Sequence, residues 1–152
     1  MKLSRAFTAI VFALMSAGAC FATADNKTDN KEYEDILVQS ATEIDKMFGD
    51  KIDEHTVVLG ADYIKDGSVN RFVYYYGVSP LLWDDFVESY YSGDEMKTAV
   101  FEELAATVKE DNDFKLFINI LIEMNAEMAY TYICRSEYVS LVFSTEDLKQ
   151  LK

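Results

Sequence analysis

Few residues of this chain are suited to acid–base or nucleophilic chemistry. His55 is the only histidine, and Cys134 is the only cysteine beyond the first 24 residues. The two could form a thiolate–imidazole pair. However, Cys134 lies in a strand-like segment, where a lone cysteine usually packs as a small apolar side chain. The sequence therefore predicts no catalytic residue, and a metal site built from several histidines is excluded.

Carboxylates are abundant, and most of them fall on predicted helix surfaces. Asp84-Asp85 and Glu102-Glu103 are such pairs, and a two-carboxylate glycosidase would need only residues of this type. The acidic run that begins at Glu110 does not form a calcium loop, since counting from Asp111 puts Leu116 and Ile122 where Gly and Glu are required. We expect exposed acidic faces, with no metal and no cofactor.

Tyrosine is the most prominent remaining feature. Its ring provides apolar area and its hydroxyl a polar tip, so it serves both half-buried sheets and interfaces. The conservative interpretation is core packing. If one sheet face is uncovered, tyrosines flanked by acids would dock a basic protein. The candidate partner-binding face then comprises Tyr74, Tyr76, Trp83, Asp84, Asp85, Tyr130 and Tyr132.

The first 24 residues have the layout of a secretory signal peptide. Lys2 and Arg5 form a basic start, residues 6–15 carry no charge, and Ala22-Thr23-Ala24 is an Ala-x-Ala cleavage site. The uncharged run is shorter than the roughly 20 residues of a membrane-spanning helix. We predict cleavage after Ala24 and export to the periplasm or medium, with no transmembrane segment in the mature chain.

Two further predictions follow for this end of the chain. Cys20 stands after Ala17-Gly18-Ala19, a degenerate bacterial lipobox, so a lipid anchor at Cys20 is the alternative to soluble export. Residues 25–32 are polar, and we expect a flexible lead-in there, followed by a single domain over residues 33–152.

The net charge of the 152-residue chain is −13. Loss of the leader, which contains two basic residues and no acid, would take it to −15. Such a charge disfavours binding to nucleic acid and favours a basic protein partner.

Hydrophobic periodicity predicts how these residues are positioned. Apolar residues recur at helical spacing over residues 31–48, whereas the period becomes two in the strand segments. Asp66-Gly67 is a hairpin turn signal. Asp94 is expected to cap a helix, and Ser144 with Asp147 has the spacing of a capping box. The further elements are strands at 56–64, 69–78, 128–134 and 138–143, and helices at 80–91, 94–109, 114–125 and 145–151.

The predicted fold is α+β: two β-hairpins form a mainly antiparallel four-stranded sheet, packed with about four to five helices. The C-terminal segments Tyr130-Thr131-Tyr132 and 139–148 (VSLVFSTEDL) resemble the tail of a loose family of small exported bacterial proteins of unknown function. That family has proline where this chain has Thr145. The resemblance implies fold and export, and no activity or site residue.

The sequence thus favours a small exported non-catalytic binding protein, in the manner of an inhibitor or immunity protein for a basic partner. One alternative is a structural or envelope-maintenance protein that self-associates through an exposed hairpin edge. A small enzyme that uses Cys134 or a carboxylate pair is the third hypothesis.

Overall fold

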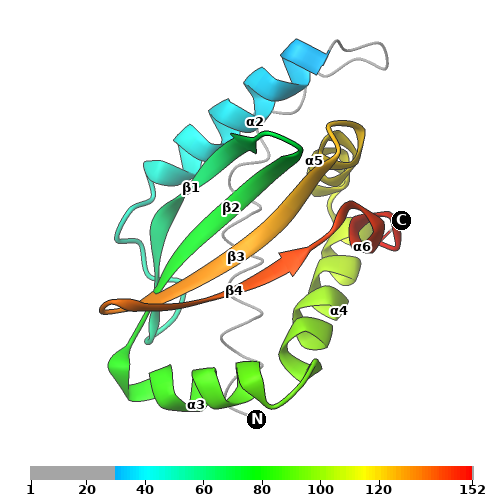
Figure 1. The fold of residues 1–152 in the computed structure, drawn as a ribbon. Coiled ribbons are helices and arrows are strands. Elements are labelled where there is room, and N and C mark those ends of the chain that lie inside the picture. The colour runs from blue at the N-terminus through cyan, green and yellow to red at the C-terminus, as the bar shows by residue number, and fades with distance from the viewer. Residues whose placement is uncertain (1–29, 152) are drawn as a thin grey trace.

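The computed structural model describes residues 30–151 and confirms the α+β prediction (Figure 1). Five helices and four strands follow one another in the order expected from the periodicity. The signal peptide, Cys20 and residues 25–29 lie outside the described residues. The elements are α2 (Asn30–Asp45), β1 (Thr56–Asp66), β2 (Val69–Val78), α3 (Pro80–Tyr91), α4 (Glu95–Glu110), α5 (Asn112–Glu123), β3 (Ala126–Cys134), β4 (Glu137–Phe143) and α6 (Thr145–Lys149).

The four strands form one sheet in the order β1-β2-β3-β4. β1 pairs with β2, and β3 pairs with β4, as two antiparallel hairpins. β2 and β3 are parallel, with Tyr74 opposite Tyr130 and Tyr76 opposite Tyr132. A parallel pair needs a long crossover, and α3, α4 and α5 supply it.

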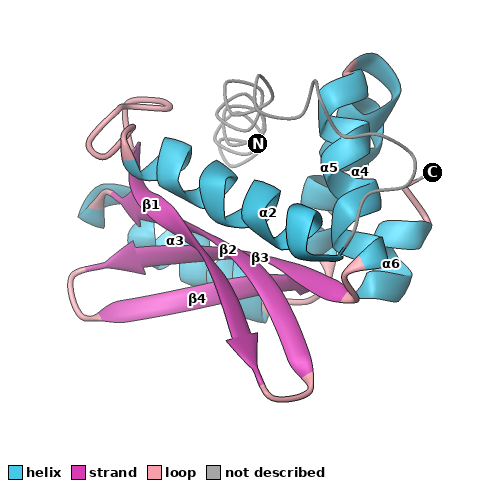
Figure 2. Ribbon diagram, turned by 90° about the horizontal axis from the view of Figure 1, so that it is seen from above, coloured by secondary structure: helices cyan, strands magenta, loops and turns pink. Residues whose placement is uncertain are grey.

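One side of this sheet is covered and the other is open. Figure 2 shows α2 and α5 on the same side of the sheet, with no described helix lying against the opposite side. We call these sides the covered face and the open face. Side chains alternate along each strand, so Phe72, Tyr74 and Tyr76 belong to the covered face and Arg71, Val73 and Tyr75 to the open face.

The helix α2 begins at Asn30, so residues 30–32 are helical and the predicted lead-in is wrong there. The helix ends at Asp45 and turns follow, because the chain must reverse before β1. A β-bulge next to Gly60 meets this helix end, and Gly60 has a φ of 143°. The Asp45 carboxylate accepts a hydrogen bond from the Ala61 N–H at 3.0 Å, which ties α2 to β1.

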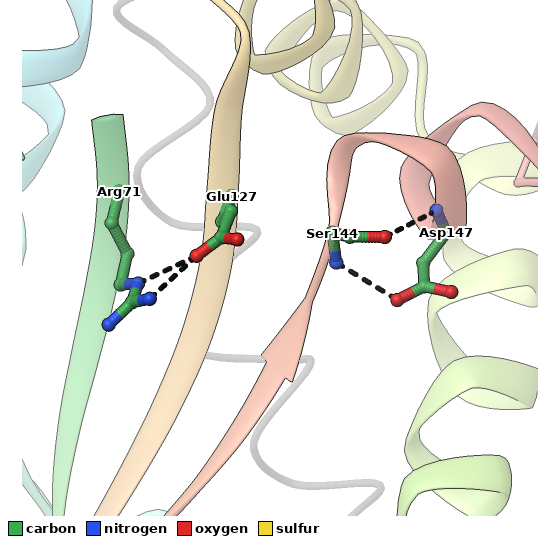
Figure 3. A network of polar contacts seen from close by, with 4 residues as sticks. All are labelled: Arg71, Glu127, Ser144 and Asp147. Carbon is green, nitrogen blue, oxygen red and sulfur yellow. Dashed lines mark hydrogen bonds and ion pairs between the residues drawn. The ribbon is translucent and has the colours of Figure 1, made fainter. Parts of the chain in front are cut away.

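The other helix starts follow local sequence signals, with one exception. Asp111 Oδ1 accepts hydrogen bonds from the N–H groups of Asp113 and Phe114 at the start of α5. Ser144 and Asp147 form the predicted capping box, which Figure 3 shows as two reciprocal hydrogen bonds. Asp94 makes no side-chain cap to α4, so that prediction is wrong, and its φ of −82° and ψ of 4° are not those of an extended cap residue.

Candidate functional site

Five of the seven residues in the predicted partner-binding face are in the hydrophobic core, namely the four tyrosines and Trp83. Tyr74, Tyr76, Tyr130 and Tyr132 are at most 3% exposed, because they point from β2 and β3 to the covered face beneath the helices. They cannot contact a partner in the folded domain, and that part of the prediction is wrong. The conservative interpretation of these tyrosines, core packing, is confirmed.

The core tyrosines form a continuous cluster across the parallel strand pair. The Tyr74 and Tyr130 rings lie 5.2 Å apart between centroids, and the Tyr76 and Tyr132 rings lie 5.8 Å apart. Burial disfavours the phenolate, and so it raises the pKa of all four hydroxyls. Among the described residues, the Tyr132 hydroxyl has no hydrogen-bond partner.

The three predicted residues that are not tyrosines lie together on α3. Trp83 is 6% exposed, and its ring stacks on Phe86 with 5.9 Å between centroids. The Trp83 Nε1–H donates a hydrogen bond to Glu137 Oε2 at 2.8 Å, which links α3 to the start of β4. Asp84 and Asp85 are exposed.

A groove of about 560 Å³ lies beside this contact, between α3 and the β3–β4 hairpin. We call it the α3–β4 groove. Its wall on α3 contains Trp83, Val87 and Tyr91 with the carboxylates of Asp84 and Glu88. Its other wall contains the Glu137 carboxylate and the Tyr138 ring. No Lys, Arg or His is among the lining residues, which are Trp83, Asp84, Val87, Glu88, Tyr91, Ser136, Glu137, Tyr138 and Val139.

The electrostatics of the α3–β4 groove follow from its composition. Asp84 and Glu88 make no ion pair within residues 30–151, and Glu137 is engaged only by the neutral indole N–H. The groove therefore presents negative charge beside exposed rings, and Tyr91 and Tyr138 are 73% and 70% exposed. Such a surface can accept hydrogen bonds from a cationic side chain and stack against its apolar stem.

The groove continues along the free edge of β4. A second hollow of about 600 Å³ is lined by the end of α3, the start of α4 and residues 140–142. There the Tyr90 hydroxyl donates a hydrogen bond to the Ser140 carbonyl at 2.9 Å. This bond occupies an outward carbonyl of the edge strand, which leaves that part of the edge less suited to strand-to-strand association.

Among the described residues, no contact joins the two residues considered for covalent chemistry, and His55 Nε2 lies 3.9 Å from a carboxylate oxygen of its neighbour Glu54. Cys134 is a free thiol and is 5% exposed, as expected for a buried apolar residue. Within residues 30–151, no group of three or more His, Cys, Asp or Glu side chains is placed to hold a metal ion.

Part of the groove was missed from the sequence. Glu88 follows Asp84 by four residues and Tyr91 follows Glu88 by three, so the three side chains share one side of α3 and helical periodicity could have grouped them. Glu137 and Tyr138 could not be grouped with them, because their approach to α3 depends on tertiary packing.

Comparison with known proteins supports the fold. No protein-family model matches the chain, and no curated protein matches it. A crystal structure of an inferred secreted protein from Pseudomonas aeruginosa is similar to it, with a TM-score of 0.52 and 12% identity. The match covers 82% of this chain and 98% of that one, so the two share an arrangement of elements. Within residues 30–151, no helix has the length and apolar content needed to cross a membrane.

Proposed function

We propose that this chain is an exported, non-catalytic binding protein whose α3–β4 groove takes up a basic segment of a protein partner. The observation that carries the proposal is the composition of the groove, in which three carboxylates and exposed aromatic rings stand together without a basic residue. Export is supported by the predicted signal peptide and by the similarity in fold to an inferred secreted protein.

The net charge of the whole chain favours the same kind of partner as the groove does. A net charge of −13 attracts a basic partner over a distance of about one Debye length, and the local carboxylates then select the docking position. Electrostatic complementarity of this kind raises association rates and excludes acidic competitors. An inhibitor or immunity protein for a basic exported enzyme is the form of partner binding that this charge fits best.

Affinity capture with matched variants tests the proposal. The bait is the protein purified from cells that express the full chain, and the extract is the native envelope fraction in low and high salt. Asp84→Asn/Glu88→Gln removes two charges from the groove. Glu102→Gln/Glu110→Gln removes two charges from exposed positions on α4 and is the control.

We expect the wild-type protein and the control to capture one stoichiometric basic protein in low salt and to lose it in high salt. The groove variant should bind the same protein about tenfold more weakly, since rim charges contribute about 0.5–1 kcal/mol each. Trp83 is the only tryptophan, so its emission reports occupation of the groove directly. Recovery of the bait alone, or equal binding by both variants, would contradict the proposal.

A further inference from the structure

The open face lies on the sheet itself and meets the α3–β4 groove only at Ser136, Glu137 and Tyr138, which line both. It contains a shallow hollow of about 380 Å³ across β2, β3 and β4. At its centre, Val73, Ala129 and Thr131 are 5%, 2% and 9% exposed although no described helix covers them. Larger apolar side chains surround them, including Ile64 at 40% and Tyr138 at 70% exposure. Exposed apolar side chains at the rim of a sheet face that no described helix covers are a feature of interaction surfaces.

The charges on the open face nearly balance, in contrast to the rest of this acidic chain. Asp62 and Glu127 face the same side as Arg71 and Arg135, and Glu137 also lines the hollow, so two bases stand against three carboxylates and the five charges sum to −1. The α3–β4 groove has three carboxylates and no base, and two copies of it would repel each other. The open face can therefore approach a second copy of itself at a lower electrostatic cost than the α3–β4 groove.

The arrangement of these charges is also self-complementary. Glu127 lies near the start of β3, and Arg135 immediately follows the end of the same strand. Arg71 Nε and Nη2 both donate to Glu127 Oε2, at 3.0 and 2.7 Å, and no donor within residues 30–151 bonds Oε1 (Figure 3). A two-fold axis perpendicular to the strands would bring Arg135 of each copy over Glu127 of the other. Isologous interfaces require this reciprocal relation.

We propose that the open face is the interface of a two-fold symmetric homodimer, with the two sheets packed face to face and Arg135 of each copy paired with Glu127 of the other. With strands about 4.8 Å apart and about 3.3 Å per residue, a four-stranded face about eight residues long covers roughly 500 Å². Two such faces bury at most roughly 1,000 Å², the lower limit for a specific interface. The dimer is therefore weak and forms at high protein concentration.

Sedimentation equilibrium over a concentration series tests this dimer, using protein purified from cells that express the full chain. We expect the weight-average mass to rise from that of a monomer near about 1 µM towards twice that value near about 500 µM, the range for an interface of this size. Ile133→Lys places a charge in the open face and should weaken association at least tenfold. Val38→Lys makes the same kind of change on α2, where Val38 is 48% exposed, and should leave association unchanged.

A second variant tests the pairing of Arg135 with Glu127 of the other copy. It also provides an independent test of the dimer if Ile133→Lys fails to fold. Arg135 has a φ of 58°, a conformation that aspartate tolerates, so Arg135→Asp reverses the charge without straining the turn. We expect at least a tenfold loss of association, whereas Lys115→Glu on the exposed side of α5 should have no such effect. The groove variant Asp84→Asn/Glu88→Gln should dimerise like the wild type, so the outcome is independent of the proposed function.

Three results would overturn the dimer. The wild-type protein could stay monomeric at about 500 µM, the top of the range in which a weak interface assembles. Folded Ile133→Lys and Arg135→Asp could both associate as strongly as the wild type. Native mass spectrometry could show a co-purified apolar molecule whose removal leaves a monomer, which would assign the open face to a ligand.

Discussion

The two faces of the sheet are built from neighbouring residues of the same strands and have different properties. Tyr74 and Tyr75 are adjacent, yet Tyr74 is 3% exposed among core rings and Tyr75 is only half-buried on the open face. The covered face contains the tyrosine cluster. The open face pairs the Thr131 and Ser140 hydroxyls at 2.8 Å and the charges of Arg71 and Glu127.

This difference shows that the face to which a tyrosine points decides its role. A phenol under the helices loses contact with water and contributes packing, so it stabilises the fold. A phenol on the open face keeps one side available to a partner. The comparison can be tested by perturbing matched residues on the two faces, and the expected effects are given from the largest to the smallest.

Alkaline pH should unfold the protein because it favours ionisation of the buried tyrosines on the covered face. Burial raises the pKa of Tyr74, Tyr76, Tyr130 and Tyr132 above the usual value near 10, so the folded state retains protons that the unfolded chain releases. Their contribution is complete below pH 10 and is lost as the pH rises towards the folded pKa values. Each group contributes roughly 1.4 kcal/mol per pH unit, so the free energy of unfolding falls by up to about 5 kcal/mol per unit.

Phenolate absorbance at about 295 nm and far-UV circular dichroism, followed together against pH, measure this effect. We expect the tyrosines outside the cluster to ionise before the four buried ones, which should ionise only as the helical signal is lost. Ionisation of all ten tyrosines in a protein that stays folded would contradict the burial of the cluster.

Truncation of one tyrosine on each face compares the faces directly. Tyr130→Ala removes a fully buried ring that lies 5.2 Å from Tyr74 and should cost about 4 kcal/mol of unfolding free energy. Tyr75→Ala removes the same atoms from a half-buried position and should cost about 1 kcal/mol. Urea unfolding at low micromolar concentration, where the proposed dimer is dissociated, measures both variants. Equal losses would show that the open face is covered in solution.

Removal of a single hydroxyl has the smallest expected effect. Within residues 30–151 the Tyr132 hydroxyl is buried without a partner, so Tyr132→Phe should leave the free energy of unfolding unchanged or raise it by about 1 kcal/mol. Tyr130→Phe is the control, because its hydroxyl has only the Met128 sulfur at 3.9 Å as acceptor. The melting temperatures of Tyr132→Phe and Tyr130→Phe, each compared with that of the wild type, measure these effects. A clear loss of stability in Tyr132→Phe alone would reveal a bound water or another acceptor near this hydroxyl.

Local signals predicted most of the fold. The Asp66-Gly67 turn, the helix that starts at Pro80 and the Ser144–Asp147 capping box all depend on residues close together in sequence, and all three are found. The helix cap expected at Asp94 depends on backbone angles as well as residue type, and it is not formed. The helical period over residues 31–48 predicted the start of α2 at Asn30 to within one residue, whereas the helix ends at Asp45, three residues before the predicted end.

The candidate site was predicted only in part. Asp84 and Asp85 are exposed as expected, and Trp83 lines the groove while its ring packs into the core. The four tyrosines had two interpretations, core packing and a docking face, because alternation along a strand separates its two faces without showing which one the helices cover.

The sequence by itself determined the elements, their order, the α+β class and the acidic charge, because periodicity, caps, turns and composition act over a few residues or over the whole chain. Only the tertiary structure decided that β2 and β3 are parallel neighbours, that the helices cover the face of Tyr74, and that Glu137 meets Trp83. These contacts join residues more than 50 positions apart. They depend on how the crossover packs, which no local pattern specifies.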